Sequence, residues 1–122
     1  MNALDSIVAR HAPQARAGLI PALQAAQAAS GGWLPRAVIE TVARGLKVPL
    51  ADAYGVIEFY SMLYTEPVGV TMVRVCDDVL CRLNGGSVVL SAIEAELSIK
   101  ASETTADGRF TLEAVPCLGA CH

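Results

Sequence analysis

The chain has 122 residues, of which 53% are hydrophobic, and nine basic against twelve acidic residues give it a formal net charge of −3. This length accommodates one or two small globular units. The charge balance lacks the basic excess of a nucleic-acid-binding protein. The apolar stretches end well before the roughly 20 residues that a membrane span requires. The sequence therefore predicts neither nucleic-acid binding nor direct membrane insertion.

The first ten residues lack the basic lead, apolar core and small-residue cleavage site of a secretory signal. A cytoplasmic location is therefore expected. In that reducing compartment, cysteines serve as metal ligands or catalytic thiols more often than as disulfides.

The first half of the chain has the periodicity of helices. Residues 14–29 are rich in alanine and glutamine, and Pro21 should bend this helix or mark its start. A second helix should begin at Pro35. A third should begin near Leu50. The predicted buried faces of the second and third helices consist of Val38, Ile39, Val42, Ala43 and Leu46, and of Ala53, Val56, Ile57 and Tyr60.

Strand-like alternation replaces this periodicity near residues 66–69. A boundary there predicts a helical domain over residues 1–66 and a second domain over residues 67–122. In the second domain we expect a strand, a helix and a hairpin with its turn at Asp107-Gly108. They are expected at residues 70–75, 87–97 and 104–112.

The chain contains four cysteines, arranged as Cys76-x4-Cys81 and Cys117-x3-Cys121. Each pair is expected in a short loop that follows a predicted strand, so both pairs can lie at one edge of a small α/β layer. Backbone N–H groups near Gly85-Gly86 and Gly119 are candidate donors to sulfur, because glycine tolerates the close approach. The sequence thus predicts a metal centre at this edge.

The chemistry of four paired thiols leaves alternatives. Structural zinc takes four thiolates in pairs about two to four residues apart, and an iron–sulfur cluster also takes four. Two disulfides would suit a secreted chain, and a thiol redox pair would favour Cys-x-x-Cys. The missing secretion signal argues against disulfides, and the absent Cys-x-x-Cys argues against a thiol redox pair, so a metal centre is favoured. An iron–sulfur cluster is favoured over zinc, because these spacings are less typical of zinc sites than Cys-x-x-Cys.

Several stretches along nearly the whole chain resemble the thioredoxin-like [2Fe-2S] subunits of bacterial NADH-linked oxidoreductases. They are residues 32–39, 56–61, 66–69, 75–81, 105–112 and 117–121. The resemblance implies an α+β protein, in which an N-terminal helical bundle precedes a thioredoxin-like [2Fe-2S] ferredoxin domain. The chain stops one residue after Cys121, where this family continues with a hairpin and a helix, so the resemblance also implies a C-terminally truncated domain.

This family includes the small peripheral, or E-type, subunit of NADH:quinone oxidoreductase (complex I), its counterpart in bidirectional hydrogenases and the gamma subunit of NAD-dependent formate dehydrogenase. Residues 84–100 and 103–113 are most similar to the formate dehydrogenase subunit. That complex is therefore the predicted parent, and the E-type subunits are the alternative. A four-cysteine zinc-bound interaction module is the alternative from another class.

The resemblance further implies that Cys76, Cys81, Cys117 and Cys121 ligate one [2Fe-2S] cluster. Arg74 and Arg82 are candidates to offset its negative charge. FMN and NAD are expected on a partner subunit, with a larger catalytic subunit in the same complex. No Gly-x-Gly-x-x-Gly fingerprint is present, so this chain is expected to relay electrons and to have no catalytic residue of its own.

A helix-turn-helix is a further alternative for residues 39–60. The presumed recognition helix from Leu50 to Tyr60 has no lysine or arginine and two acidic residues. Such a helix cannot neutralise phosphates, which argues against DNA binding.

Overall fold

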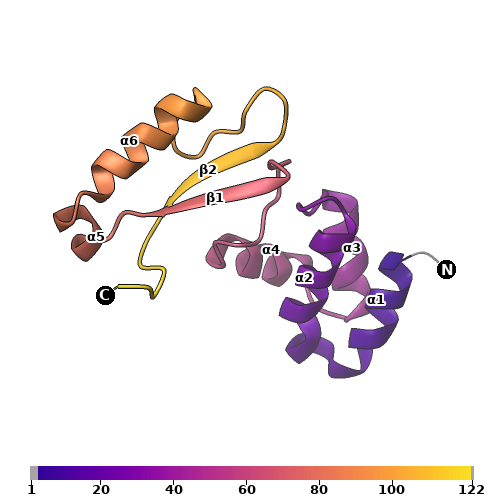
Figure 1. Ribbon diagram of the computed structural model, residues 1–122. Coiled ribbons are helices and arrows are strands. Elements are labelled where there is room, and N and C mark those ends of the chain that lie inside the picture. Colours follow the sequence, from indigo (N-terminus) through magenta and orange to yellow (C-terminus); the bar gives the residue numbers. More distant parts are fainter. Residues whose placement is uncertain (1–2, 122) are drawn as a thin grey trace. The chain divides into compact units, whose positions relative to one another are not determined.

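The computed structural model describes residues 3–121, and the chain divides into two compact units, Met1–Pro67 and Val68–His122. The first unit contains α1 (Ala3–His11), the 3-10 segment η1 (Ala12–Gly18), α2 (Leu19–Ala29), α3 (Arg36–Gly45) and α4 (Leu50–Phe59). The second contains β1 (Thr71–Cys76), α5 (Val79–Leu83), α6 (Gly86–Leu97) and β2 (Phe110–Val115), as Figure 1 shows. The predicted α+β class is confirmed. Within residues 3–121, no helix combines the length and apolar character needed to cross a bilayer.

Apolar side chains that recur on one face of each helix form the core of the first unit. In α3, for example, Ile39 and Val42 are fully buried, whereas the Arg36 guanidinium lies outside and pairs with Glu40 at 2.7 Å. This is the pattern of an amphipathic helix packed on its neighbours. The buried cluster consists of Leu19, Ala22, Leu23, Ala26, Leu34, Ile39, Val42, Ala43, Leu46, Val48, Ala53, Ile57 and Leu63.

The helix predicted over residues 14–29 is shorter than expected. Ala15 has φ 49° and ψ −127°, which is not helical, and α2 begins only at Leu19. Pro21 is the third residue of α2, where its missing N–H costs nothing because the first backbone N–H groups of a helix have no acceptor. Pro21 therefore marks the helix start and does not bend it. α1 lies outside the predicted helices, although its Ile7 and Val8 pack against the core.

The third predicted helix is confirmed as α4, but its apolar face ends sooner than expected. Ala53 and Ile57 are buried. Tyr60 leaves the helix with φ −91° and ψ 119°, and it is 43% exposed. The prediction that Tyr60 continues the buried face was wrong because the backbone becomes extended at this residue.

In the second unit, β1 and β2 pair in parallel, with a register that runs from Thr71 opposite Phe110 to Cys76 opposite Val115. A parallel pair requires a long crossover, and α5 and α6 belong to it. α6 lies against one face of the sheet (Figure 1). Because the strands are parallel, the segments that follow β1 and β2 leave the sheet at the same end.

The predicted hairpin is present only in part. The turn forms at Asp107 and Gly108, where Gly108 has φ 73° and its N–H donates to the Thr105 carbonyl at 2.9 Å. The first arm is reduced to one antiparallel bridge between Thr104 and Thr111. The Ser102 N–H still donates to the Leu112 carbonyl at 2.6 Å, but Ser102 has φ 72°, which is not a strand conformation.

Thr111 is buried, and its hydroxyl joins two segments. The oxygen accepts from the Gly69 N–H at 2.6 Å and lies 2.7 Å from the Thr104 hydroxyl. We expect Thr111→Val to leave the buried Gly69 N–H without an acceptor and to lower the free energy of unfolding by about 1–3 kcal/mol. Urea denaturation measures this loss. Thr41→Val in α3 is the control, expected to change stability by no more than about 0.5 kcal/mol. Equal losses in the two variants would contradict the role of Thr111.

Candidate metal centre

The first cysteine pair spans the end of β1 and the short helix that follows. Cys76 is the last residue of β1. The Asp78 carboxylate accepts from the Val79 N–H at 2.8 Å and so caps α5, which places Cys81 within a helix. The expectation that Cys81 lies in a loop was wrong, because this cap starts a helical turn directly after the strand.

The second pair lies in the turn after β2. The thiols of Cys117 and Cys121 are 3.4 Å apart, and the Gly119 N–H donates to the Cys117 sulfur at 3.2 Å. Gly119 has φ 77°, a left-handed conformation that glycine adopts without strain. The expected donation from this glycine to sulfur is confirmed.

Gly85 and Gly86 act differently from the expectation. The Gly85 N–H donates to the Arg82 carbonyl at 3.2 Å and so ends α5. Gly86 begins α6, and a Cβ added to it would lie 2.7 Å from the Cys81 carbonyl oxygen. This residue therefore allows α6 to approach the backbone of residues 76–81, which carry the first cysteine pair and are called the cysteine loop, although Cys81 itself lies in α5.

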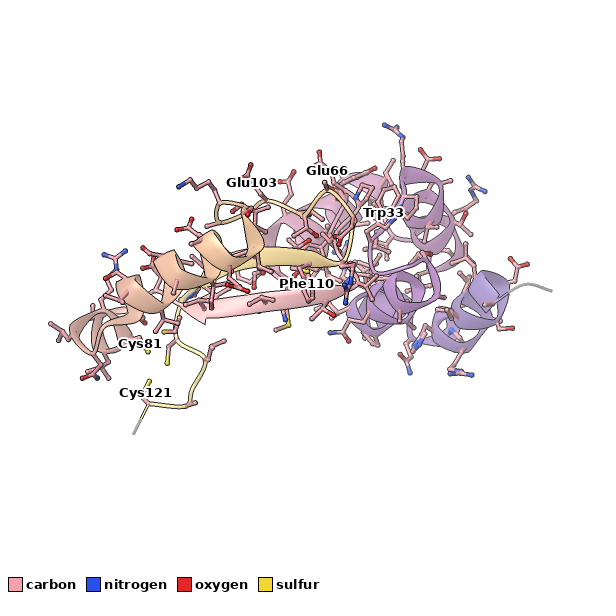
Figure 2. All side chains as sticks on the ribbon, turned by 45° about the horizontal axis from the view of Figure 1, so that its top comes forward. Trp33, Glu66, Cys81, Glu103, Phe110 and Cys121 are labelled. Carbon is pink, nitrogen blue, oxygen red and sulfur yellow. The ribbon has the colours of Figure 1, made fainter. Side chains whose placement is uncertain are left out.

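The two pairs meet at one cavity. The register places Cys76 opposite Val115, so the segments that carry both pairs leave the sheet together. A cavity of about 90 Å³ is lined by Cys76, Asp78, Val79, Leu80, Cys81, Cys117 and Cys121. Figure 2 shows Cys81 and Cys121 at the same end of the second unit. The four cysteines thus line one cavity at the end of the sheet where both strands stop.

Proximity of the thiols disfavours their ionisation while no metal is bound. The pKa of Cys81 is raised to about 11, chiefly by its side-chain hydrogen bond with Cys76, then by burial and by the other cysteines. The pKa of Cys121 is also raised, chiefly by its hydrogen bond with Cys117. Because thiolates are the metal-binding form, occupation of this cavity by a metal centre must release protons.

We expect Cys81 of the metal-free protein to resist alkylation at mildly alkaline pH. Its pKa of about 11, against an ordinary value of 9.0, leaves about 100-fold less thiolate well below pH 9, and thiolate is the reactive form. Iodoacetamide labelling at increasing pH, read by peptide mass spectrometry, should show labelling at Cys81 that still rises near pH 11. A plateau near pH 9 would contradict the raised pKa.

The two arginines near this edge both pair with carboxylates. Arg82 donates from Nε and Nη2 to the two carboxylate oxygens of Asp77, at 2.8 Å and 3.0 Å. This contact lowers the pKa of Asp77 below its usual value. Arg74 lies 3.4 Å from Glu113 on the neighbouring strand. Each positive charge therefore already has a negative partner, which reduces what either arginine contributes against a further anionic group.

The donor set fits a cluster with two metal atoms. The sulfurs form two close pairs, and four thiolates are what a [2Fe-2S] centre takes. One pair already accepts a backbone N–H, of the kind that tunes such centres. Among residues 3–121, no three His, Cys, Asp or Glu side chains are placed together to hold one metal ion.

Comparisons with known proteins show which family these features belong to. Residues 4–122 match the family described as thioredoxin-like [2Fe-2S] ferredoxin, which carries one [2Fe-2S] cluster. The E-type subunit of the NADH-quinone oxidoreductase from Rickettsia typhi is 40% identical over 122 residues, which is 99% of this chain and 72% of that protein. The corresponding subunits from Escherichia coli K12 and Pseudomonas aeruginosa are 42% and 41% identical over 111 residues, covering 91% of this chain and 66% of each relative.

These relatives favour the alternative over the predicted parent complex. The stretches at residues 84–100 and 103–113 suggested the gamma subunit of formate dehydrogenase, but the relatives carry the name of the E-type alternative. The match to a [2Fe-2S] family also favours the iron–sulfur interpretation of the four cysteines over zinc. The chain belongs to the thioredoxin-like [2Fe-2S] ferredoxin family.

Proposed function

We propose that this chain is the E-type electron-transfer subunit of an NADH-quinone oxidoreductase, with one [2Fe-2S] cluster held by Cys76, Cys81, Cys117 and Cys121. The observation that supports this most is the convergence of two cysteine pairs on one cavity in a member of this family. The names of the relatives support the parent complex. When bound, such a cluster supplies the transfer of one electron at a time.

In this proposal the protein holds the cluster and passes electrons to or from a partner. Hydride chemistry requires an organic cofactor, so we assign FMN and NAD to a flavin-binding partner subunit. A larger subunit would complete the complex. The helical residues 1–66 and the cysteine-bearing residues 67–122 would act as two domains. A cytoplasmic location would keep the four free thiols reduced.

Exposed apolar side chains beside the cysteines support a protein partner at this edge. Val79 and Leu80 line the cysteine cavity and are nevertheless 66% and 58% exposed. Leu118, between the cysteines of the second pair, is 55% exposed. Contiguous exposed apolar side chains mark interaction surfaces. Covering them would also exclude water from the cavity.

The proposal is tested by EPR spectra of the anaerobically purified chain before and after dithionite, with iron and acid-labile sulfide counted on the same sample. We expect a rhombic signal only after reduction, with about two irons and two sulfides per chain. A colourless protein that carries zinc would overturn the electron-transfer assignment. Co-purification with dehydrogenase subunits of another kind would overturn the assigned parent complex alone.

A further inference from the structure

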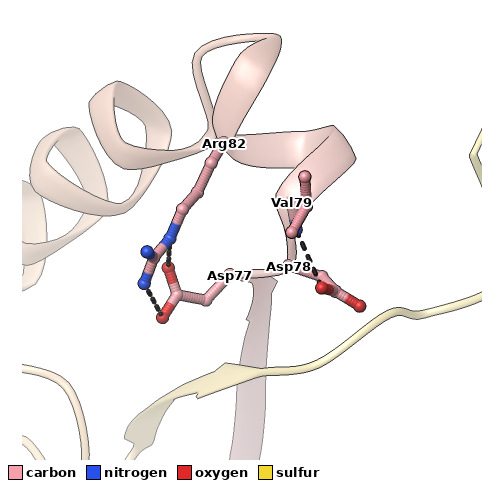
Figure 3. A network of polar contacts seen from close by, with 4 residues as sticks. All are labelled: Asp77, Asp78, Val79 and Arg82. Carbon is pink, nitrogen blue, oxygen red and sulfur yellow. Dashed lines mark hydrogen bonds and ion pairs between the residues drawn. The ribbon is translucent and has the colours of Figure 1, made fainter.

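The two residues that directly follow the cysteines of the first pair are joined by an ion pair. Asp77 follows Cys76, and Arg82 follows Cys81. The Arg82 guanidinium donates twice to the Asp77 carboxylate, at 2.8 Å and 3.0 Å (Figure 3). Two parallel hydrogen bonds fix both the distance and the orientation of the partners.

Each end of this ion pair is attached to a different element. The Asp77 N–H donates to the Val115 carbonyl at 2.7 Å, which ties Asp77 to the end of β2. Arg82 belongs to α5, where its N–H donates to the Asp78 carbonyl at 2.9 Å. The five-residue separation is not that of neighbours on a helix face. The pair therefore links the end of the sheet to the helix.

We infer that Asp77 and Arg82 are positioning residues, which hold α5 against the end of the sheet and thereby set the separation of the Cys76 and Cys81 thiols. This inference rests on the proposed function, in which these thiols bind a cluster. α5 extends only from Val79 to Leu83. None of its residues is buried, so side-chain packing in a core does not fix its direction. A swing of α5 would carry the Cys81 sulfur with it.

The contribution is local and not one of global stability. The two side chains are 62% and 38% exposed, and exposed ion pairs contribute little to the stability of a fold. Residues that orient metal ligands nevertheless affect metal retention strongly. Loss of the pair should therefore loosen the cysteine loop while the rest of the unit stays folded.

The test compares wild type, Arg82→Gln, Asp77→Asn and the double variant, each as the full chain. The lifetime of the cluster is followed by its visible absorbance in the presence of a chelator. We expect each single variant to lose the cluster about 10-fold faster than wild type. The double variant should be no faster than either single one, because one interaction has been removed in all three. Arg82→Lys, which keeps the charge but not the paired geometry, should be intermediate.

A measurement without the cluster separates positioning from other effects. In the metal-free protein, hydrogen exchange at the backbone amides of positions 82 and 84 should be several-fold faster in Arg82→Gln, because in wild type the Arg82 and Asn84 amides bond within α5. Arg36→Gln, which removes the Arg36–Glu40 pair in α3, is the matched control and should change neither readout.

The outcomes distinguish the two claims. Unchanged exchange and equal cluster lifetimes in wild type and Arg82→Gln would overturn the positioning role alone. Additive effects of the two single changes would also overturn it. A wild-type chain that takes up no cluster would overturn the proposed function and the positioning role with it.

Discussion

Cys81→Ala is expected to lower bound iron from about two atoms per chain to nearly none, as a four-thiolate site requires. The change removes one sulfur from the cavity that the four cysteines line. Alanine is the best helix former, so α5 itself should persist. The loss can therefore be attributed to the missing ligand. Iron and sulfide analysis and the EPR signal of the reduced protein measure it.

Leu83→Ala is the matched control for this prediction. Leu83 lies on the same helix and is 78% exposed, so its truncation should leave iron content unchanged. Thermal unfolding of both variants in metal-free form should be close to wild type. Full iron content in Cys81→Ala would show that Cys81 is not a ligand, and the proposed ligand set would then be wrong.

The convergence of the cysteines could be predicted from the sequence because it depends on where the two strands end and on the direction in which they run. A strand rich in β-branched residues ends at Cys76, and a second strand ends just before Cys117. A helix between two strands favours a parallel pair, and the carboxyl ends of parallel strands lie at the same end of the sheet. Helical periodicity correctly predicted the burial of Ile39, Val42 and Ala43 in α3 and of Ala53 and Ile57 in α4, whereas Val38 and Val56 are only partly buried.

The features that escaped prediction depend on contacts that a local pattern does not contain. The position of Cys81 in a helix depends on the Asp78 cap, which forms only once β1 has ended. The Asp77–Arg82 pair has no helical spacing, so only the turn from strand to helix brings its members together. The φ of Gly86 is not left-handed, so the backbone conformation alone does not require glycine there. Glycine is required because an added Cβ would clash with the Cys81 carbonyl where α6 packs on the cysteine loop.

Gly86→Ala is therefore expected to disturb the metal centre without touching a ligand. The added Cβ would lie 2.7 Å from the carbonyl oxygen and 3.0 Å from the carbonyl carbon of Cys81, and 3.3 Å from the carbonyl oxygen of Cys76. All three atoms are backbone, so no rotamer change relieves the clash. α6 or the cysteine loop must move, at a cost of about 1–3 kcal/mol, as for overpacking in a core.

The movement should shorten cluster lifetime in the presence of a chelator by about 10-fold, as expected when the surroundings of metal ligands shift. Gly55→Ala in α4 is the opposite case, because nothing lies within 4 Å of its added Cβ. That variant should gain about 0.5–1 kcal/mol, since alanine is favoured over glycine inside a helix, and its cluster should be retained as in wild type. If Gly86→Ala kept the wild-type lifetime, the cysteine loop would be able to adjust to α6, and the close approach of the two backbones would not be what shapes the cavity.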